Sequence, residues 1–247
     1  MDTGLNGKTV LVTGATGGIG AACCRAFSGE HANVVVADLD STATDSLARE
    51  LGGDSLGTAL DVTDPQSVTA AVELATATFG ALDVLVSCAG IFHATPLDEI
   101  SVDEWDRIQA VNLRGTFLVA QAAVRVMIPR RTGRVITVAS LAGQTGGLAA
   151  GASYAASKAG VVALTKSIAR YAGPHGVTAN SVNPGVIETS MLDGWAPEAV
   201  GTVVDATPLR RVGTPDEVAS TVVWLASDGA SFVHGAHVDV NGGLYMT

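Results

Sequence analysis

The sequence predicts an α/β protein built on one Rossmann-type, doubly wound sheet of seven parallel strands, with helices on both faces. Short runs of β-branched apolar residues alternate with longer helix-compatible segments along the whole chain, which is typical of this class. Most of the runs are apolar at consecutive positions, as expected of strands that are buried on both faces. A glycine-rich turn also follows the first run and opens a helix, as in dinucleotide-binding sheets.

The predicted elements follow one another in this alternating order. The expected strands are short and apolar: 9–12, 34–37, 56–60, 84–86, 135–138, 177–182 and 238–240. The expected helices occupy the segments between them: 18–29, 42–51, 65–79, 103–127, 153–173 and 215–227. Asp64-Pro65 and Thr214-Pro215 each resemble an N-cap followed by proline at the first helical position.

Composition points to one enzyme-sized domain, residues 1–247, with no linker to divide it. Hydrophobic residues make up 47% of the chain and charged residues 15%, which is enough for one large core. The net charge of −10 argues against nucleic acid or an anionic membrane as a partner. Three cysteines, at 23, 24 and 88, are too few for a disulfide framework or a zinc site, and the five histidines form no metal-like cluster. Without a recognisable targeting segment, we expect a cytoplasmic protein.

The glycine-rich turn is the first candidate site. Gly14-Ala15-Thr16-Gly17-Gly18-Ile19-Gly20 follows the first predicted strand and leads into a helix. Glycine lets the backbone turn tightly and approach a pyrophosphate, and the helix N-terminus offers N–H groups and partial positive charge to the phosphates. A tight strand-to-helix turn alone would also use glycine, so the turn needs a second observation.

Acidic residues at the ends of the next strands supply that observation. Asp38 ends the second predicted strand, where a carboxylate accepts both ribose hydroxyls of adenosine and repels a 2′-phosphate. A solvated loop acid is the alternative for Asp38, and it fits the neighbouring Asp40. The glycine turn holds no Arg or Lys to bind a 2′-phosphate, so both features favour NAD over NADP. Asp61-Val62 can face the adenine amine, or Asp61 can serve as a turn or capping acid; Ser87-Cys88-Ala89-Gly90 offers small residues beside the cofactor.

A second group of residues is the candidate for proton transfer. Tyr154 and Lys158 lie one helical turn apart on the same face. A tyrosine pKa near ~10 is too high for acid–base work at neutral pH, and a cation one turn away should lower it. Ser140 ends the fifth predicted strand, where its hydroxyl can hold a substrate oxygen beside Tyr154. The alternative is a packed tyrosine beside a lysine that reaches to solvent.

Three further residues have open roles. Asn112 lies within a helical pattern, where asparagine indicates either a hydrogen-bonding duty or a local kink. Thr189 follows the sixth strand after Pro184-Gly185 and can bond a carboxamide. His93 is the one histidine near a predicted strand end, so it could reach a substrate.

At these residues the chain resembles the short-chain dehydrogenase/reductase family over essentially its whole length. The glycine turn resembles that family's cofactor loop, and Asn112, Ser140, Tyr154 and Lys158 match its catalytic tetrad one by one. The resemblance implies Tyr154 as acid/base, Ser140 as partner of the substrate oxygen, Lys158 as a ribose ligand that tunes Tyr154, and Asn112 as holder of a relay water. It also implies a homotetramer, with helices 103–127 and 153–173 and the C-terminal segment at interfaces.

The chain departs from the family in two places. Ser87-Cys88-Ala89-Gly90 stands where Asn-Asn-Ala-Gly is common, and Asn241-Gly242-Gly243 replaces Asp-Gly-Gly. The segment of about 189–213 resembles the substrate loop of 3-oxoacyl-carrier-protein reductases. Those relatives usually prefer NADP, with a basic residue where this chain has Gly17, and they use two arginines for the carrier protein. Arg131 matches one of them, and His175 stands at the other.

We therefore predict an NAD(H)-dependent oxidoreductase that interconverts a secondary alcohol and a ketone. The alternatives are a 3-oxoacyl-ACP or CoA thioester reductase and, more remotely, a non-catalytic NAD-binding sensor or scaffold. The expected cofactor-binding residues are Gly14, Thr16, Gly17, Gly18, Ile19, Gly20, Asp38, Leu39, Asp61, Val62, Ala89, Gly90, Tyr154, Lys158, Pro184, Gly185, Ile187 and Thr189. The expected substrate-contacting residues are Ser140, Leu141, Gln144, Tyr154, Met191 and Trp195, with Gly147, Phe92 and His93 as further candidates.

Overall fold

Seven parallel strands form one sheet in the order β3-β2-β1-β4-β5-β6-β7. The structure is a computed structural model that describes residues 3–147, 150–193 and 195–246. The strands are β1 (Thr9–Thr13), β2 (Asn33–Asp38), β3 (Leu56–Ala59), β4 (Val84–Ser87), β5 (Gly133–Val138), β6 (Val177–Pro184) and β7 (His237–Val240). The predicted fold class and all seven predicted strands are confirmed.

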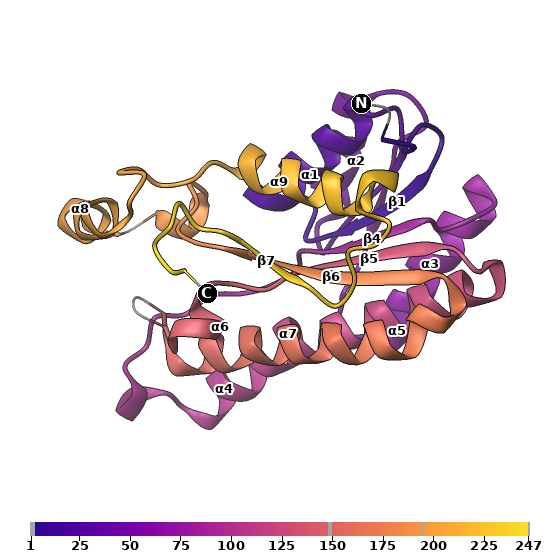
Figure 1. Cartoon of the computed structure of the whole chain (residues 1–247). Coiled ribbons are helices and arrows are strands. Elements are labelled where there is room, and N and C mark those ends of the chain that lie inside the picture. The colour runs from indigo at the N-terminus through magenta and orange to yellow at the C-terminus, as the bar shows by residue number, and fades with distance from the viewer. Residues whose placement is uncertain (1–2, 148–149, 194, 247) are drawn as a thin grey trace.

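Helices cover both faces of the sheet (Figure 1). On one face lie α1 (Gly18–Gly29), α2 (Ser41–Leu51) and α9 (Pro215–Ala226), and on the other α3 (Pro65–Phe79), α5 (Thr116–Met127) and α7 (Ala152–Ala172). Each face has its own apolar core, because consecutive strand residues point to opposite sides of the sheet. Val10 and Val12 of β1 pack under α1 and α9, whereas Leu11 packs under α3 and α5.

The predicted helix starts are also present. Asp64 accepts a hydrogen bond from the Gln66 N–H and caps α3, and Thr214 begins α9 in a capping box with Glu217. Asp40, which we considered a solvated loop acid, instead caps α2 by accepting hydrogen bonds from Thr42 and Ala43. Its carboxylate satisfies N–H groups that have no partner within the helix.

The helix predicted over 103–127 is present as one helical run, which is π-helical in its middle part. It consists of α4 (Val102–Ile108), a π-helical segment (Gln109–Gly115) and α5. The run Val102–Arg130 spans 29 residues and is long and apolar enough to cross a membrane by length and composition alone. It packs on α3, α7 and strands β4 and β5, so in this fold it is a core helix.

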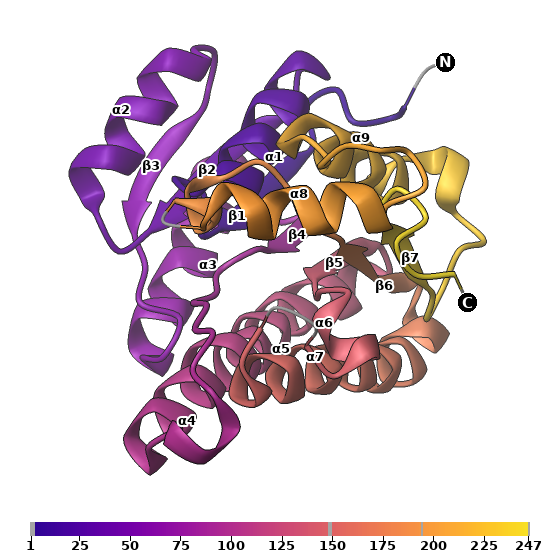
Figure 2. The same ribbon diagram turned by 90° about the vertical axis from the view of Figure 1, so that its left-hand side faces the viewer.

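Two helices were absent from the sequence prediction. The short α6 (Ala142–Thr145) follows β5, and α8 (Pro197–Ala206) lies between β6 and α9. Figure 2 shows α8 crossing in front of the carboxyl ends of the central strands, the edge at which ligands bind in open α/β sheets.

Candidate functional site

One large cleft of about 1010 Å³ opens at the carboxyl edge of the sheet, and every residue that we predicted to hold the cofactor lines it. Its walls come from the turns after β1, β2, β4, β5 and β6, together with α7 and α8. Ser140, Leu141, Met191 and Trp195 line the same cleft. The topology therefore brings the glycine turn and the Tyr154 group together, although they lie far apart in the sequence.

Three glycines of the turn, Gly14, Gly18 and Gly20, have no room for a side chain. Gly14 has a φ of +63°, and a Cβ there would lie 2.7 Å from the Ala89 backbone. A Cβ on Gly20 would collide with the carbonyl oxygen of Gly14, and one on Gly18 would lie 2.6 Å from the Thr189 Cγ2. Gly17 occupies the N-cap position of α1 but has no side chain to accept a hydrogen bond from the first turn. That turn also carries no acidic side chain. The N-terminus of α1 is thus a positively polarised, uncapped end that faces the cleft.

Asp38 joins this turn to β2. Its carboxylate accepts hydrogen bonds from the Thr16 N–H at 3.0 Å, the Thr16 hydroxyl at 2.6 Å and the Leu39 N–H at 2.8 Å. A carboxylate has about four acceptor positions, so it can accept a further hydroxyl from the cleft. Asp61 also lines the cleft, and its Oδ1 accepts hydrogen bonds from the Thr63 N–H and hydroxyl. Asp61 is therefore the turn acid that we considered, in a position that also faces the cleft.

Tyr154, Ser140 and Lys158 meet on the opposite wall. Ser140 follows β5, and its hydroxyl lies near the Tyr154 phenol, where it favours the ionised form. The Ser140 Oγ also accepts a hydrogen bond from the Ala142 N–H at 3.1 Å, which holds the hydroxyl in place. Phe92 packs edge-on against the Tyr154 ring with centroids 5.1 Å apart, and Lys158 Nζ lies 5.7 Å from that ring's centroid.

The electrostatics of this group differ from the sequence prediction. Burial raises the pKa of Tyr154 above its ordinary value, and the nearby Ser140 hydroxyl opposes the rise. Burial also lowers the pKa of Lys158 to about 8. The predicted lowering of the Tyr154 pKa is therefore wrong for this structure, because loss of water outweighs the opposing influence of the Ser140 hydroxyl. The Lys158 ammonium instead donates a hydrogen bond to the Val138 carbonyl at 2.8 Å.

Asn112 has a hydrogen-bonding role and also lies where the helix departs from regular α-helical geometry. It lies in the π-helical segment, and its buried side chain clamps the chain after β4. The Oδ1 accepts a hydrogen bond from the Ile91 N–H at 2.8 Å, and the Nδ2 donates to the Ile91 carbonyl at 2.9 Å and the Ser157 Oγ at 3.1 Å. Asn112 does not itself line the cleft. It holds Ile91, which does, against the helix that carries Tyr154.

Three predicted substrate contacts are not in the cleft. Gln144 does not line it, although Ala142 and Thr145 of the same helix α6 do, and neither Gly147, which follows α6, nor the exposed His93 lines it. Residues of α8 and Arg107 of α4 line the cleft and were not predicted. No motif in the sequence singles them out, since only the path of the chain brings them there. Among residues 3–147, 150–193 and 195–246, no three His, Cys, Asp or Glu side chains gather as metal ligands would.

Comparison with known proteins agrees with this geometry. Residues 14–245 match the family profile described as enoyl-(acyl carrier protein) reductase. The chain is 40% identical over 242 residues to the 3-oxoacyl-(acyl-carrier-protein) reductase of Vibrio cholerae, covering 98% of this chain and 99% of that protein. It is 39% identical over 250 residues to the D-threitol dehydrogenase of Mycolicibacterium smegmatis, covering 98% and 95%. A solved 3-oxoacyl-(acyl-carrier protein) reductase from Brucella melitensis matches with a TM-score of 0.94 and 36% identity, covering 100% and 94%.

Proposed function

The chain belongs to the short-chain dehydrogenase/reductase family, whose members are oxidoreductases that bind a nicotinamide cofactor, and we propose that it interconverts a 3-oxoacyl thioester and the 3-hydroxyacyl thioester with NAD(H). One observation carries the reaction type: Tyr154 and Ser140 line the same cleft as the glycine turn. The thioester substrate is supported by the similarity to 3-oxoacyl reductases. This substrate was our alternative prediction, and the relatives favour it over an unspecified secondary alcohol.

A nicotinamide dinucleotide fits the residues of the cleft. The uncapped N-terminus of α1 and the cradle of Gly14, Gly18 and Gly20 suit a pyrophosphate, because any Cβ in that cradle would collide with neighbouring atoms. Asp38 would accept the adenosine ribose hydroxyls, and its negative charge would repel a 2′-phosphate. Lys158 would hold the second ribose. When bound, the cofactor donates or accepts the hydride.

Tyr154 supplies the proton in the reductive direction. Because burial raises its pKa, the phenol is protonated at neutral pH and can donate to the substrate oxygen as that oxygen gains charge. Ser140, held by the Ala142 N–H, offers a second hydrogen bond to the same oxygen. Both donors are placed before substrate arrives, so little reorganisation is needed during the reaction.

Lys158 and Asn112 support this pair. With a pKa of about 8, Lys158 is mostly protonated at neutral pH, and its charge lies beside the Tyr154 ring. Approach of a phosphorylated cofactor would favour the charged lysine further. Asn112 fixes Ile91 and Ser157 relative to each other, so it positions the wall next to Tyr154.

Oxidation of a small secondary alcohol by NAD is the second candidate. The D-threitol dehydrogenase of Mycolicibacterium smegmatis is as similar to this chain as the 3-oxoacyl reductases are. In that direction Tyr154 would first lose its proton, and the phenolate would then accept the hydroxyl proton of such a substrate.

The experiment is to follow nicotinamide absorbance with acetoacetyl-CoA and either NADH or NADPH. Turnover that favours NADH supports the proposal. Turnover with NADPH alone overturns the assignment of Asp38. Absence of thioester turnover, together with NAD-dependent oxidation of polyols, selects the second candidate. Binding of NADH without turnover of either substrate class indicates a non-catalytic sensor.

We also propose a homotetramer. Large apolar side chains are exposed on the helices expected at interfaces, including Trp105, Phe117 and Tyr171, and near the C-terminal segment, including Trp224 and Phe232. Light scattering in solution tests the assembly, and a monomer would contradict it.

A further inference from the structure

The chain between β6 and α9 leaves the body of the protein and meets it again at two places: the Leu209 N–H donates to the Gly242 carbonyl at 3.2 Å, and Gly213 lies beside Ile187. Ile187 and Gly213 form an isolated parallel bridge. The Gly213 N–H donates to the Val186 carbonyl at 3.0 Å, and the Glu188 N–H donates to the Gly213 carbonyl at 2.9 Å. A Cβ on Gly213 would lie 2.6 Å from the Ile187 Cδ1, so the two strands touch directly. Residues 188–212 therefore form a loop whose two ends are fixed side by side.

Helix α8 lies within this loop and forms a wall of the cleft. Ala199, Thr202, Val203 and Ala206 line the cavity, and no residue of α8 is buried. Among the described helices and strands, none packs along α8, and Figure 1 shows it standing apart from the sheet. Since no residue of α8 is buried, its position over the cleft depends on how the chain on either side is held: Leu209 is bonded to Gly242 just after the helix, and the loop ends meet at Ile187 and Gly213.

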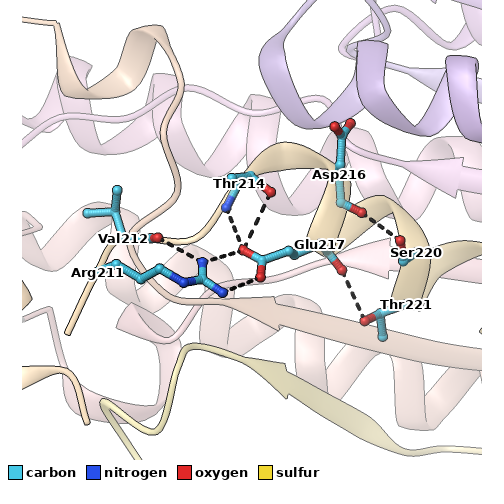
Figure 3. Close-up of polar contacts among 7 residues, drawn as sticks. All are labelled: Arg211, Val212, Thr214, Asp216, Glu217, Ser220 and Thr221. Carbon is cyan, nitrogen blue, oxygen red and sulfur yellow. Dashed lines mark hydrogen bonds and ion pairs between the residues drawn. The ribbon is translucent and has the colours of Figure 1, made fainter. Parts of the chain in front are cut away.

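A single carboxylate holds the returning end (Figure 3). Glu217 accepts two hydrogen bonds from the Arg211 guanidinium, at 2.8 and 2.5 Å, and one from the Thr214 N–H at 2.8 Å. Arg211 also donates to the Val212 carbonyl at 3.2 Å. Glu217 thus bonds residues on both sides of Gly213. Because the guanidinium and the carboxylate form two hydrogen bonds side by side, they restrict rotation of residues 211–217 more than a single hydrogen bond would.

The first part of the loop, at Thr189, is held against the glycine turn. Thr189 follows the bridge by two residues, and its side chain packs where a Cβ of Gly18 would lie. Its Oγ1 accepts a hydrogen bond from the Met191 N–H at 3.3 Å. A shift of Gly213 relative to Ile187 would therefore disturb both α8 and the contact with the glycine turn.

We propose that Arg211 and Glu217 are positioning residues that hold α8 over the cleft and so set the affinity for the acyl chain of the substrate. They take no part in proton transfer. The proposal rests on the proposed function only in treating the cleft as the acyl site.

The pair is suited to positioning rather than to global stability. The Arg211 and Glu217 side chains are 51% and 40% exposed, and exposed ion pairs contribute little to the free energy of unfolding. Arg211 and the Thr214 N–H hold the pKa of Glu217 at about 2, so the pair stays charged throughout the range in which the enzyme would be assayed. Loss of the pair should therefore change the loop and leave the core intact.

The test compares Arg211→Gln with Arg25→Gln. Arg25 forms a similar exposed pair with Glu50, at 2.7 Å, between α1 and α2 and outside the cleft. We expect Arg211→Gln to raise KM for acetoacetyl-CoA about tenfold while kcat changes less than about threefold. Amide hydrogen exchange in α8 should accelerate about tenfold or more, with exchange in α1 and α7 unchanged. Arg25→Gln should alter neither KM nor the exchange of α8.

Glu217→Gln and Arg211→Lys complete the series. Glu217→Gln retains an oxygen that accepts from the Thr214 N–H but loses the charged pair of hydrogen bonds with Arg211. It should therefore show the same faster amide hydrogen exchange in α8 as Arg211→Gln. Arg211→Lys retains the charge with a single hydrogen bond and should fall between Arg211→Gln and wild type. Unchanged exchange of α8, or equal acceleration throughout the protein, overturns the proposal. Because exchange needs no turnover, this result is independent of whether a thioester is the substrate.

Discussion

Thr16 donates two hydrogen bonds to one oxygen of Asp38, from its N–H at 3.0 Å and from its hydroxyl at 2.6 Å. The carboxylate thereby fixes the glycine turn to the end of β2. The other oxygen accepts the Leu39 N–H at 2.8 Å and has room for a further donor. The Asp38 side chain can thus hold the glycine turn in place and also discriminate between NAD and NADP.

Asp38→Asn tests the selective part of this role. The amide oxygen can still accept from Thr16, but the negative charge that repels a 2′-phosphate is gone. We expect the ratio of kcat/KM for NADH over NADPH to fall by about tenfold or more. Asp40→Asn, which alters only the cap of α2, is the control and should leave the ratio unchanged. An unchanged ratio in Asp38→Asn would mean that the acid serves only the turn.

Gly18→Ala should weaken NADH binding. The new Cβ would lie 2.6 Å from the Thr189 Cγ2, and crowding of this kind costs about 1–3 kcal/mol, or roughly tenfold or more in affinity. Thr189→Ser removes that methyl group, so the double variant should recover most of the affinity in a fluorescence titration. Gly29→Ala, in the same helix with open space around it, serves as the control. Additive losses in the double variant would contradict the steric explanation.

Tyr154→Phe should lower kcat by about 10²–10⁴-fold, the usual contribution of a positioned acid. Its affinity for NADH should stay near that of wild type, because the aromatic ring and its contact with Phe92 are retained. Tyr171→Phe changes an exposed tyrosine outside the cleft and should have no effect. Full activity in Tyr154→Phe would require another proton donor.

Lys158 should make the protein more stable as pH rises from about 8 to 9. Its pKa is about 8 in the folded protein and 10.5 in the unfolded chain, so in this range the unfolded chain binds more protons. The free energy of unfolding should therefore increase by at most about 1.4 kcal/mol per pH unit. Above about pH 9 the raised pKa values of buried Cys23 and Cys24 act in the opposite direction, because those thiols ionise first in the unfolded chain.

Urea unfolding at pH 7, 8 and 9 measures this slope. Lys158→Met should abolish it, whereas Lys166→Met, at an exposed site on the same helix, should retain it. The same slope in Lys158→Met and wild type would show that another group is responsible.

Most of the fold follows from patterns that the sequence displays directly. Most strands of the sheet are short apolar runs, and the caps at Asp64 and Thr214 mark helix starts through local hydrogen bonds. Helix α8 has a weaker signature: Pro197 and Glu198 are typical of a helix start, but the N-cap Ala196 offers no side-chain hydrogen bond and none of the helix residues is buried. The π-helical segment leaves only the unexpected Asn112 as a trace in the sequence.

The properties of the site likewise divide into those that the sequence predicts and those that only the folded structure shows. Strand-end residues such as Asp38 and Ser140 are predictable, because the carboxyl ends of parallel strands share one edge. The direction of the Tyr154 pKa is not, since it depends on how much water the folded protein excludes from the phenol. Gln144 and His93 were misplaced because a position after a strand end does not reveal which side chains of the next segment face the cleft; in α6, Ala142 and Thr145 line it and Gln144 does not.

The central place of β1 in the sheet has a consequence for synthesis on the ribosome. This strand is made first, yet β2 and β4 flank it, and the glycine turn that follows it is enclosed by Ala89 and Thr189. A nascent chain that ends before Thr189 lacks one wall of the dinucleotide cradle. The protein should therefore acquire its affinity for the cofactor late in translation, and free dinucleotide should offer little protection from proteases to shorter nascent chains.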